Sequence, residues 1–535
     1  MRTPSRAPLP LWLAVLLAAA AGPVLDAGFP DKDVWPLTFV GIAMVLLAQR
    51  GRRAGSGFLV GFVAGVSFYL VHVAWTALYL GPVPWVALSV LEALFCGAGG
   101  VLLTLAYRWL PRAFPTLLGR LGLLPVVIGG LWVLREFVTG TWPYGGFSWG
   151  RVAESQSTSP LAPMVAWLGI SGVSFVMVWL VALLVESPFT VEVGSASRAL
   201  LAGIAVALVF AVPAWPATTH GTTRIAAVQG NGPAGYFDNA PEGAVFDTQV
   251  TETLQIPAKE RTGANRVDMV VWPEGSALPD PTRDPQTAEA LDALGRLYKA
   301  PFIVGTITQR DDKLYNTSLQ WEAGRGAVDY YDKKHPVPFG EYVPDRAFWR
   351  PFAPSLIDLI GRDYTPGTRD NVFDVGGVRA GISICFDIVD DQLLTDMMRG
   401  GAQVILAQTN NADFGETDEN QQQLAIARLR AIESGRSLVN ISTVGSSQII
   451  GPDGSTISSI APFKPGHMVA DVPLGTTTTP ATLLSRGIEF LVAGLGLFGL
   501  FAAFVGRRNP ALLPLVPLQE PRRAADMKRP SSPRR

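Results

Sequence analysis

Two hydrophobic patterns divide the chain. Up to about residue 216, long apolar runs follow one another with short polar connections, and one further run lies near the C-terminus. About 20 apolar residues in a helix cross a hydrocarbon core of roughly 30 Å. Runs that meet or approach this length lie at 10–27, 34–49, 56–76, 84–107, 121–139, 161–185, 198–216 and 485–506. The pattern predicts a polytopic α-helical membrane domain over 1–216, with about seven spans, and a last span at 485–506.

The pattern changes near Thr222, where short β-rich runs begin to alternate with helical stretches. Strands are predicted at 224–228, 267–272, 301–308, 316–321, 327–332, 378–385, 403–408, 438–444 and 447–450. Helices are predicted near 242–259, 285–299, 389–400 and 419–435. Strands separated by helices of this size indicate an α/β domain over 217–484, with its active residues at the carboxyl ends of strands.

Composition agrees with the membrane assignment. Hydrophobic residues make up 48% of the 535 residues and charged residues only 16%, whereas charged residues are about a quarter of a typical soluble protein. The first run follows Arg2 and Arg6 and ends in small residues, which alone is typical of a cleaved secretory signal. Because six further runs precede the α/β domain, we expect the first one to be retained as a membrane helix.

Lysine and arginine in the loops predict the orientation, because cytoplasmic loops are enriched in these residues. Arginines follow the second and fourth runs, and a basic tail follows the last run: Arg50, Arg52, Arg53, Arg108, Arg112, Arg120 and then Arg507 onward. If every run crosses the membrane, all of these arginines lie on the same side of the membrane as the N-terminus. We therefore expect the N-terminus and the tail at 507–535 to be cytoplasmic and 217–484 to be extracytoplasmic. The Pro and Arg content of the tail predicts disorder.

Charge and the rare residue types exclude several classes of function. The net charge of -1 and the lack of a basic patch with interleaved aromatics argue against a nucleic-acid partner. Cys96 lies in an apolar run and Cys385 in the α/β domain, so a disulfide between them is not expected, and Cys96 is interpreted as a small core hydrophobe. The four histidines are scattered without the spacing of a zinc site. No metal and no cofactor are expected.

Three short motifs in the α/β domain carry candidate chemistry: 271–275, 333–341 and 381–387. Glu274 follows the predicted strand 267–272, a near-continuous apolar run typical of a strand buried on both faces. Cys385 ends the predicted strand 378–385, and Asp387 follows at the start of a helix, whose N-terminal amides favour a thiolate.

A Pro-rich stretch, 336–344, makes up most of the second motif and continues a few residues past it. It cannot be a central strand, and we interpret it as a stiff loop that holds Lys333 and Glu341 in fixed relative positions. Each motif residue alone has an ordinary interpretation: a buried structural thiol for Cys385, a capping or paired carboxylate for Glu274, a solvated lysine for Lys333 and a plain loop carboxylate for Glu341.

The three residue types together fit nucleophilic catalysis. A thiol with a pKa of about 8.5 is mostly protonated at neutral pH and needs a base or a positive neighbour. Glu274 can accept the proton if burial raises its pKa, and Lys333 can stabilise both the thiolate and the oxyanion of a tetrahedral intermediate. His335 is the rival base, because it is the only histidine close to these motifs in sequence.

At these residues the chain resembles the nitrilase (carbon-nitrogen hydrolase) superfamily, whose α-β-β-α sandwich carries a Glu, Lys, Cys triad. With its membrane runs it is similar to the membrane branch, the apolipoprotein N-acyltransferases. The resemblance extends through 226–231, the three motifs and 427–436, and 337–341 discriminates best. It implies that Glu274 is the general base, Lys333 the oxyanion-stabilising cation and Cys385 the nucleophile. Glu341 is implied to be a further active-site carboxylate.

The chain departs from the family pattern at three places. The family commonly has Cys-Tyr-Glu where this chain has Cys385, Phe386 and Asp387. A tryptophan usual after the Val-Gln-Gly segment is replaced near Tyr236 and Phe237, and Asn-Asp-Ala-Trp-Phe-Gly becomes Asn-Asn-Ala-Asp-Phe-Gly at 410–415. The triad is intact, so these changes bear on substrate positioning, with Phe386 and Asp387 as supporting residues.

The resemblance implies a monomeric multi-pass enzyme of the bacterial plasma membrane. It would move a fatty acyl chain from a membrane phospholipid, through a Cys385 thioester, to the α-amino group of the diacylglyceryl-cysteine that begins an apolipoprotein. One alternative is a membrane-anchored amidase that hydrolyses a small amide. The other is a non-catalytic binding or transport protein, although the few charges inside the spans, mainly Glu92, Arg135 and Glu136, argue against an ion-coupled transporter.

Two further segments are candidates for handling lipid. The loop 141–149 is aromatic and Gly-rich, which suits the membrane interface where Trp and Tyr concentrate, and we expect it to help form the path for lipid. The segment with Leu356, Ile357, Leu359 and Ile360 is apolar, and we expect it to serve as a mobile lid.

Overall fold

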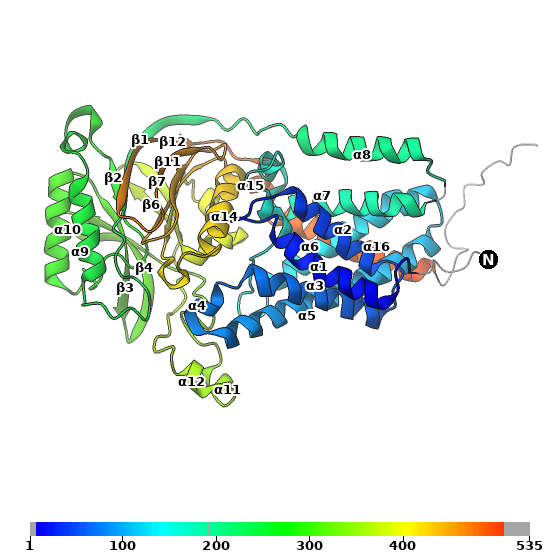
Figure 1. Cartoon of the computed structure of the whole chain (residues 1–535). Coiled ribbons are helices and arrows are strands. Elements are labelled where there is room, and N and C mark those ends of the chain that lie inside the picture. The colour runs from blue at the N-terminus through cyan, green and yellow to red at the C-terminus, as the bar shows by residue number, and fades with distance from the viewer. Residues whose placement is uncertain (1–6, 191, 508–535) are drawn as a thin grey trace, which may run out of the picture.

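The computed structural model describes residues 7–190 and 192–507. A helical bundle and a β-sandwich lie side by side, and the chain enters the sandwich after α8 and returns to the bundle with α16 (Figure 1). The predicted tail lies outside the described residues, apart from Arg507.

Each of the eight apolar runs contains a helix of the bundle. The bounds are α1 (Leu11–Asp26), α2 (Pro36–Gln49), α3 (Ala54–His72), α4 (Thr76–Leu80), α5 (Pro82–Ala113), α6 (Leu124–Thr139), α7 (Val165–Glu186), α8 (Ser195–Phe210) and α16 (Gly487–Gly506). In the described part of the chain, five helical stretches are long and apolar enough to cross a membrane: Ala54–His72, Pro82–Ala113, Leu118–Thr139, Ala162–Phe189 and Gly487–Gly506. The helices α1, α2 and α8 are apolar but shorter, so the number of spans stays a prediction.

Small residues let the bundle helices approach closely. A Cβ added to Gly61 of α3 would lie 2.5 Å from the carbonyl oxygen of Cys96 in α5, and one added to Gly130 of α6 would lie 2.3 Å from that of Val492 in α16. Such contacts are the usual means of packing helices in lipid, where there is no hydrophobic driving force between them. Cys96 therefore sits in a glycine-lined helix contact, in keeping with its interpretation as a small core residue.

The sandwich consists of two six-stranded sheets. The first runs in the order β12 (Gly466–Gly475), β1 (Thr219–Gln229), β2 (Met269–Val271), β3 (Phe302–Arg310), β4 (Lys313–Glu322) and β5 (Gly326–Asp332). The second runs in the order β11 (Thr456–Ile460), β10 (Ser447–Ile450), β9 (Ser437–Ser442), β8 (Val404–Thr409), β7 (Val378–Ile384) and β6 (Val372–Val375). The central strands β1, β2 and β3 pair in parallel, as do β7, β8 and β9.

Helices cover the outer faces of both sheets. α9 (Ala244–Gln255) and α10 (Pro285–Tyr298) pack on the first sheet, whereas α13 (Asp391–Arg399) and α14 (Glu419–Ser434) pack on the second. α14 also contacts α7, so it lies between the sandwich and the bundle (Figure 1). The predicted fold class, a helical membrane domain joined to an α-β-β-α sandwich, is confirmed.

Three strands escaped the sequence pattern. β6 is a four-residue strand that turns back at Gly376 and Gly377. β11 and β12 are antiparallel, and β11 is almost entirely exposed. Strands that are not buried on both faces lack the continuous apolar run that reveals a central strand, and for this reason these three were missed, although the partly buried β5 was predicted.

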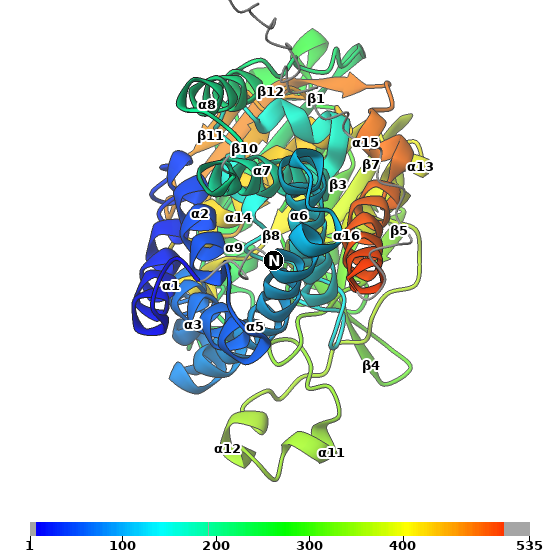
Figure 2. The ribbon, with the colours of Figure 1, turned by 90° about the vertical axis from the view of Figure 1, so that its right-hand side faces the viewer.

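The segment from Val343 to Tyr364 projects from the body of the sandwich (Figure 2). It contains two short helices, α11 (Arg346–Trp349) and α12 (Pro354–Ile357). Ile357 and Ile360 of the predicted lid are buried in a small cluster of their own, whereas Leu359 is exposed. The large exposed apolar side chains of this segment are instead Phe348 and Phe352, which were not among the residues predicted for the lid.

Candidate active site

The ends of three strands bring the motif residues together. Glu274 follows β2, Lys333 follows β5 and Cys385 follows β7, so two sheets contribute to one site. Lys333 Nζ lies 2.8 Å from Glu341 Oε2 and 3.7 Å from Glu274 Oε1. The Lys333 side chain is only 1% exposed. A buried ammonium needs such compensation, and the two carboxylates provide it.

Cys385 sits at a tight turn beside this charge cluster. Its φ of 50° is in the left-handed region, which non-glycine residues rarely occupy and which is often found at functional sites. Gln423 Nε2 lies 3.7 Å from Cys385 Sγ, and the Glu274 side chain interacts with the thiol. Burial and then the charge of Glu274 raise the pKa of Cys385, against the opposing effect of Lys333. The thiol is therefore held protonated next to a carboxylate.

The turn differs from the predicted one in its helix. Residues Cys385–Val389 form a 3-10 turn, and α13 begins only at Asp391. Asp390 caps that helix by accepting a hydrogen bond from Leu393 N at 2.7 Å. One N-terminal amide of α13 is thus capped by a side chain, and the pKa of the thiol is set by burial and by the charges of Glu274 and Lys333, not by a helix terminus.

The surroundings of two carboxylates in the site shift their pKa values in opposite directions. Burial, and then the negative charge of Glu341, raise the pKa of Glu274 in spite of the opposing effect of Lys333. Burial would also raise the pKa of Glu341, but Lys333 and the Val337 amide hold it below its ordinary value. Carboxylates whose environments push their pKa values apart suit different roles. Glu341 is a fixed counter-ion for Lys333, and Glu274 is able to exchange a proton.

Asn316 of β4 joins these two carboxylates. Its Nδ2 donates to Glu274 Oε1 at 2.6 Å and to Glu341 Oε1 at 3.0 Å. Asn316 was not predicted as a site residue, because its only signal in the sequence is its position at the start of a predicted strand. Asn316 orients both carboxylates toward Lys333.

A second polar cluster behind Cys385 was also missed. Gln423 accepts a hydrogen bond from Asn411 at 3.0 Å, and Asn411 donates to Glu419 at 2.8 Å. Burial raises the pKa of Glu419 to about 8. A run of polar residues, 419–423, opens α14. This run was the available signal, because five consecutive residues cover every face of a helix, so at least one of these polar side chains faces the interior and needs a partner there.

Asp387 ties the cysteine turn to the other sheet. Its Oδ2 accepts from the Tyr331 hydroxyl at 2.9 Å, and its Oδ1 accepts from His335 N at 3.2 Å. Burial raises the pKa of Asp387. Asp387, which is shorter than the glutamate common in the family, thus joins the cysteine turn to Tyr331 and to the backbone of His335. The imidazole of His335, the rival base, is directed to Asp390 Oδ2 at 3.4 Å, away from the hydrogen bonds of Cys385.

Phe386 connects the cysteine turn to the aromatic loop of the bundle. Its ring is stacked on Phe147 and Trp149, with interplanar angles of 13° and 7°. Trp149 in turn donates to Gln422 Oε1 at 2.7 Å, next to Gln423 in α14. A cavity of about 150 Å³ lies between this loop and the Pro-rich segment, and Phe386 and Tyr144 line it. The loop 141–149 therefore borders the site.

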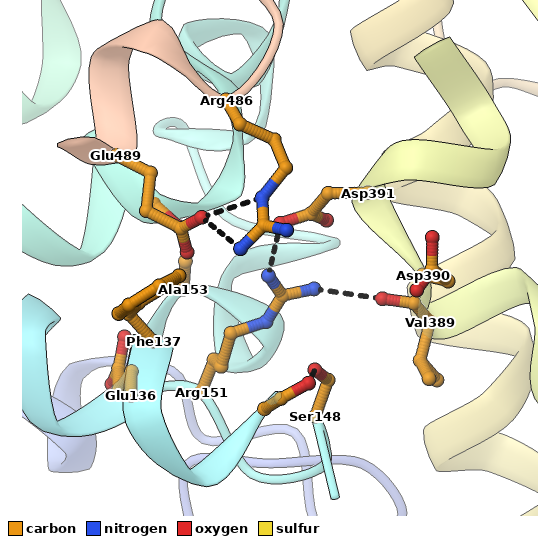
Figure 3. Close-up of polar contacts among 12 residues, drawn as sticks. Glu136, Phe137, Ser148, Arg151, Ala153, Val389, Asp390, Asp391, Arg486 and Glu489 are labelled. Atoms are coloured by element: carbon orange, nitrogen blue, oxygen red, sulfur yellow. Dashed lines mark hydrogen bonds and ion pairs between the residues drawn. The ribbon is translucent and has the colours of Figure 1, made fainter. Parts of the chain in front are cut away.

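Charged residues join the bundle to the end of the cysteine turn. Arg151, from the loop after α6, donates to Asp391 Oδ2 at 2.8 Å and to the carbonyl oxygen of Val389 at 3.3 Å. Figure 3 shows this arginine reaching across to α13, beside the ion pair that Arg486 and Glu489 form at the start of α16. The bundle thereby holds the last residue of the turn that carries Cys385.

Arg430 of α14 binds the same turn from the other side. It donates to the carbonyl oxygens of Ile388 and Val389 at 2.9 and 2.8 Å and pairs with Asp391 at 2.5 Å. Burial would raise the pKa of Asp391, but Arg151 and Arg430 hold it well below its ordinary value. Asp391 thus stays charged and bridges two arginines from distant parts of the chain.

Comparison with known proteins agrees with both parts of the fold. Residues 21–183 match the family model of the apolipoprotein N-acyltransferase N-terminal domain, and residues 224–480 match that of the carbon-nitrogen hydrolases. An apolipoprotein N-acyltransferase of Mycolicibacterium smegmatis is 31% identical over 93% of this chain and 86% of that protein. One of Geobacter metallireducens is 27% identical over 86% of this chain and 89% of that protein.

Among solved structures, an amidase from Nesterenkonia sp. is 16% identical, with a TM-score of 0.34 over 48% of this chain and 93% of that one. Nit3 of Saccharomyces cerevisiae, from branch 10 of the nitrilase superfamily, is 18% identical, with a TM-score of 0.36 over 48% of this chain and 91% of that one. From the full-length relatives and the two matched domains, the chain belongs to the apolipoprotein N-acyltransferase family.

Proposed function

We propose that the protein transfers a fatty acyl chain from a membrane phospholipid to the N-terminal α-amino group of a diacylglyceryl-modified apolipoprotein, through a thioester on Cys385. The observation that carries this proposal is the buried contact of Cys385 with Glu274 beside Lys333. A thiol, a carboxylate of raised pKa and a fixed cation are the parts that acyl transfer requires. The names of the relatives supply the acceptor.

The first step loads the cysteine. Glu274 accepts the thiol proton as Cys385 Sγ attacks the ester carbonyl carbon of the phospholipid. Lys333 stabilises the oxyanion of the tetrahedral intermediate, a role that favours preorganised positive charge. The intermediate collapses by breaking the bond to the glycerol oxygen, which takes the proton from Glu274. The products are the thioester and a lysophospholipid.

The second step transfers the acyl chain from Cys385 to the acceptor. The α-amino group of the lipoprotein attacks the thioester carbon, and Glu274 takes a proton from the attacking nitrogen. The tetrahedral intermediate then breaks its carbon–sulfur bond, and the sulfur leaves as a thiolate that regains the proton from Glu274. The product is an amide, and the enzyme returns to its starting state with no cofactor.

The surroundings of the site support lipid substrates. The bundle borders the site through the loop 141–149, and Phe348 and Phe352 expose aromatic rings on the projecting segment, with 59% and 72% of their surface free. Exposed aromatic residues of this kind suit a membrane interface. We infer that this segment, residues 343–364, dips into the bilayer and admits the acyl donor.

Orientation follows from the arginines at the far end of the bundle. Arg50 pairs with Glu186 at 2.9 Å, and Arg507 lies over the Trp109 ring at 4.2 Å. These side chains lie at the ends of α2, α7, α5 and α16 that are remote from the sandwich (Figure 1). Arginine collects on the cytoplasmic side. We therefore propose that the bundle is a multi-pass anchor in a bacterial plasma membrane and that the sandwich faces outward.

Intact-mass analysis tests the first step. The purified protein is incubated with phospholipid, and the mass increase of one acyl chain is expected on the wild type and not on Cys385→Ala. The single substitution keeps the fold, which is checked by thermal unfolding. A folded, lipid-supplied wild type that gains no acyl mass would refute the proposal.

The acceptor is tested on the loaded protein. A lipopeptide with a free diacylglyceryl-cysteine amine is expected to remove the acyl group faster than buffer alone, with formation of a triacylated peptide. Discharge by water at the same rate as by the lipopeptide would instead favour the amidase alternative.

A further inference from the structure

A caged arginine lies beside the candidate active site. The guanidinium carbon of Arg362 is 3.9 Å from the centroid of the Tyr236 ring and 5.1 Å from that of Tyr364. Its Nη1 donates to the Tyr364 hydroxyl at 3.1 Å, and Tyr79 of α4 also interacts with it. Aromatic faces attract a cation without neutralising it. The cage therefore fixes the position of Arg362 and leaves its positive charge unneutralised.

No carboxylate of the described residues lies within 4.0 Å of this guanidinium, and its buried Nε has no hydrogen-bond partner there. The neighbouring carboxylates are engaged elsewhere. Asp363 accepts from Val343 N and pairs with Arg346, whereas Asp413 accepts from Tyr236 N at 2.7 Å. A buried donor without a partner costs free energy unless a ligand satisfies it, which points to an anion from outside the chain.

The cage is attached directly to the loop that carries Glu341. Tyr364 N donates to the Glu341 carbonyl oxygen at 3.0 Å, and the Tyr79 hydroxyl donates to the Gly340 carbonyl oxygen at 2.9 Å. Glu341 is the residue that pairs with Lys333. The cation therefore stands at the base of the projecting segment, between helix α4 of the bundle and the charged groups around Cys385.

We propose that Arg362 binds the phosphate of the glycerophospholipid that donates the acyl chain. The inference rests on the proposed function and adds a binding site to it. A guanidinium is a planar donor that matches two oxygens of a phosphodiester at once. In a glycerophospholipid only the glycerol separates the phosphate from the ester carbonyls. An arginine at the edge of the site therefore fixes the headgroup while the ester reaches Cys385.

Two acyl donors separate a phosphate contact from a structural role. Dioleoyl phosphatidylglycerol and dioleoylglycerol carry the same oleoyl esters, so each is expected to load the same acyl chain, and only the first has a phosphate. The rate of acyl adduct formation on Cys385 is measured against the concentration of each in detergent micelles. For Arg362→Gln we expect the half-saturating concentration of phosphatidylglycerol to rise roughly 10- to 100-fold, the range of a charge-assisted hydrogen bond, and that of dioleoylglycerol to stay unchanged.

The chain offers a matched control. Arg369 also lies over a tyrosine ring, 4.1 Å from the Tyr330 centroid, but it is paired with Asp329 at 2.9 Å. Arg369→Gln is therefore expected to leave both donors unaffected, and Arg362→Lys to recover part of the loss on phosphatidylglycerol. Equal losses on the two donors in Arg362→Gln, or no loss on either, would overturn the assignment.

Lipid binding tests the site without acyl transfer. Cys385→Ala protein is expected to bind phosphatidylglycerol more tightly than dioleoylglycerol, and Arg362→Gln in that background should abolish the difference. Equal binding of the two lipids to Cys385→Ala would overturn the phosphate site even where acyl transfer holds, and displacement by millimolar inorganic phosphate would reassign it to a free anion. Preserved selective binding with no acyl adduct on the wild type would refute the acyltransferase proposal alone.

Discussion

At the scale of single residues, the site depends on the different surroundings of two buried glutamates. Glu341 receives a lysine at 2.8 Å and a backbone amide at 2.7 Å, so it stays charged. Glu274 is farther from the same lysine, at 3.7 Å, and its pKa is raised by burial and by Glu341. The raised pKa of Glu274 suits a group that exchanges a proton during the reaction, and its protonation state should control the rate.

The rate of adduct formation should fall on the acid side. Glu274 must be deprotonated to accept the thiol proton, and its raised pKa moves the loss of the base to a higher pH than the ordinary 4.5. As the pH falls through that raised value, Glu274 takes up a proton and the rate declines. Glu274→Gln should lower the rate by roughly 10²- to 10⁴-fold, the usual contribution of a general base, and should remove the acid limb. An unchanged acid limb in this variant would show that another group is the base.

Loss of Glu341 should destabilise the protein as well as slow it. Glu341→Gln leaves the buried ammonium of Lys333 with one distant carboxylate, and breaking a buried ion pair costs about 3–5 kcal/mol. We expect a lower thermal midpoint in detergent and slower adduct formation. The double variant Glu341→Gln, Lys333→Met should recover part of the midpoint but no activity. If the midpoint of Glu341→Gln matches the wild type, the pair is not important for stability.

At the scale of elements, the cysteine turn is held by β5 of the first sheet and by α14, the helix that covers the second sheet. Asp387 receives the Tyr331 hydroxyl of β5, and Arg430 of α14 binds the carbonyl oxygens of Ile388 and Val389. Cys385 itself has a φ of 50°, a conformation that persists only when its surroundings determine it. Loosening one of these contacts should therefore affect the geometry of the thiol before it affects the fold.

Tyr331→Phe tests this contact. Removing the hydroxyl leaves Asp387 short of a donor in a buried place, which costs about 1–3 kcal/mol, and the turn should relax. We expect adduct formation to slow while the circular dichroism spectrum is kept. Tyr330→Phe is the matched control. Tyr330 is the neighbouring residue on the same strand, and its ring lies against Arg369. Equal rates for the two variants would contradict the role of the Asp387 contact.

At the scale of the whole molecule, the bundle and the sandwich are connected through buried polar contacts. Arg151 of the bundle and Arg430 of the sandwich share Asp391, and both arginines are almost completely buried. Trp75 and Trp149 of the bundle both donate to Gln422 of α14. These contacts lie directly behind the cysteine turn, so the position of the site depends on the union of both parts.

Arg151→Met should affect both stability and activity. It leaves Asp391 with a single partner, and breaking a buried pair costs about 3–5 kcal/mol. We expect a lower thermal midpoint and slower adduct formation with both phosphatidylglycerol and dioleoylglycerol, in contrast to Arg362→Gln. Arg296→Gln removes an exposed pair with Asp292 and should change stability by less than about 1 kcal/mol. A midpoint equal to that control would exclude a role for Arg151 in joining the two parts.

Much of this organisation follows from the sequence alone. Apolar runs and the change of period near Thr222 are local, so they predicted the helical part, the α/β part and the buried strands β2, β7 and β8. The ends of the predicted strands also placed Glu274 and Cys385. Residues that follow a buried strand of an α/β domain lie at the carboxyl edge of the sheet, where active sites form. Of the strands at the sheet edges, β6, β11 and β12 lack that local pattern and were missed, whereas β5 was predicted.

The sequence by itself determined which residue types are available for acyl transfer and that they share a chain with a membrane anchor. Only the tertiary structure decided their partners: Asn316 between the two glutamates, Gln423 behind the thiol, the aromatic cage of Arg362, and Arg151 on Asp391, 240 residues away. The physical reason is that secondary structure follows from neighbours along the chain. The pKa and geometry of a buried group follow from neighbours in space, which the path of the whole chain selects.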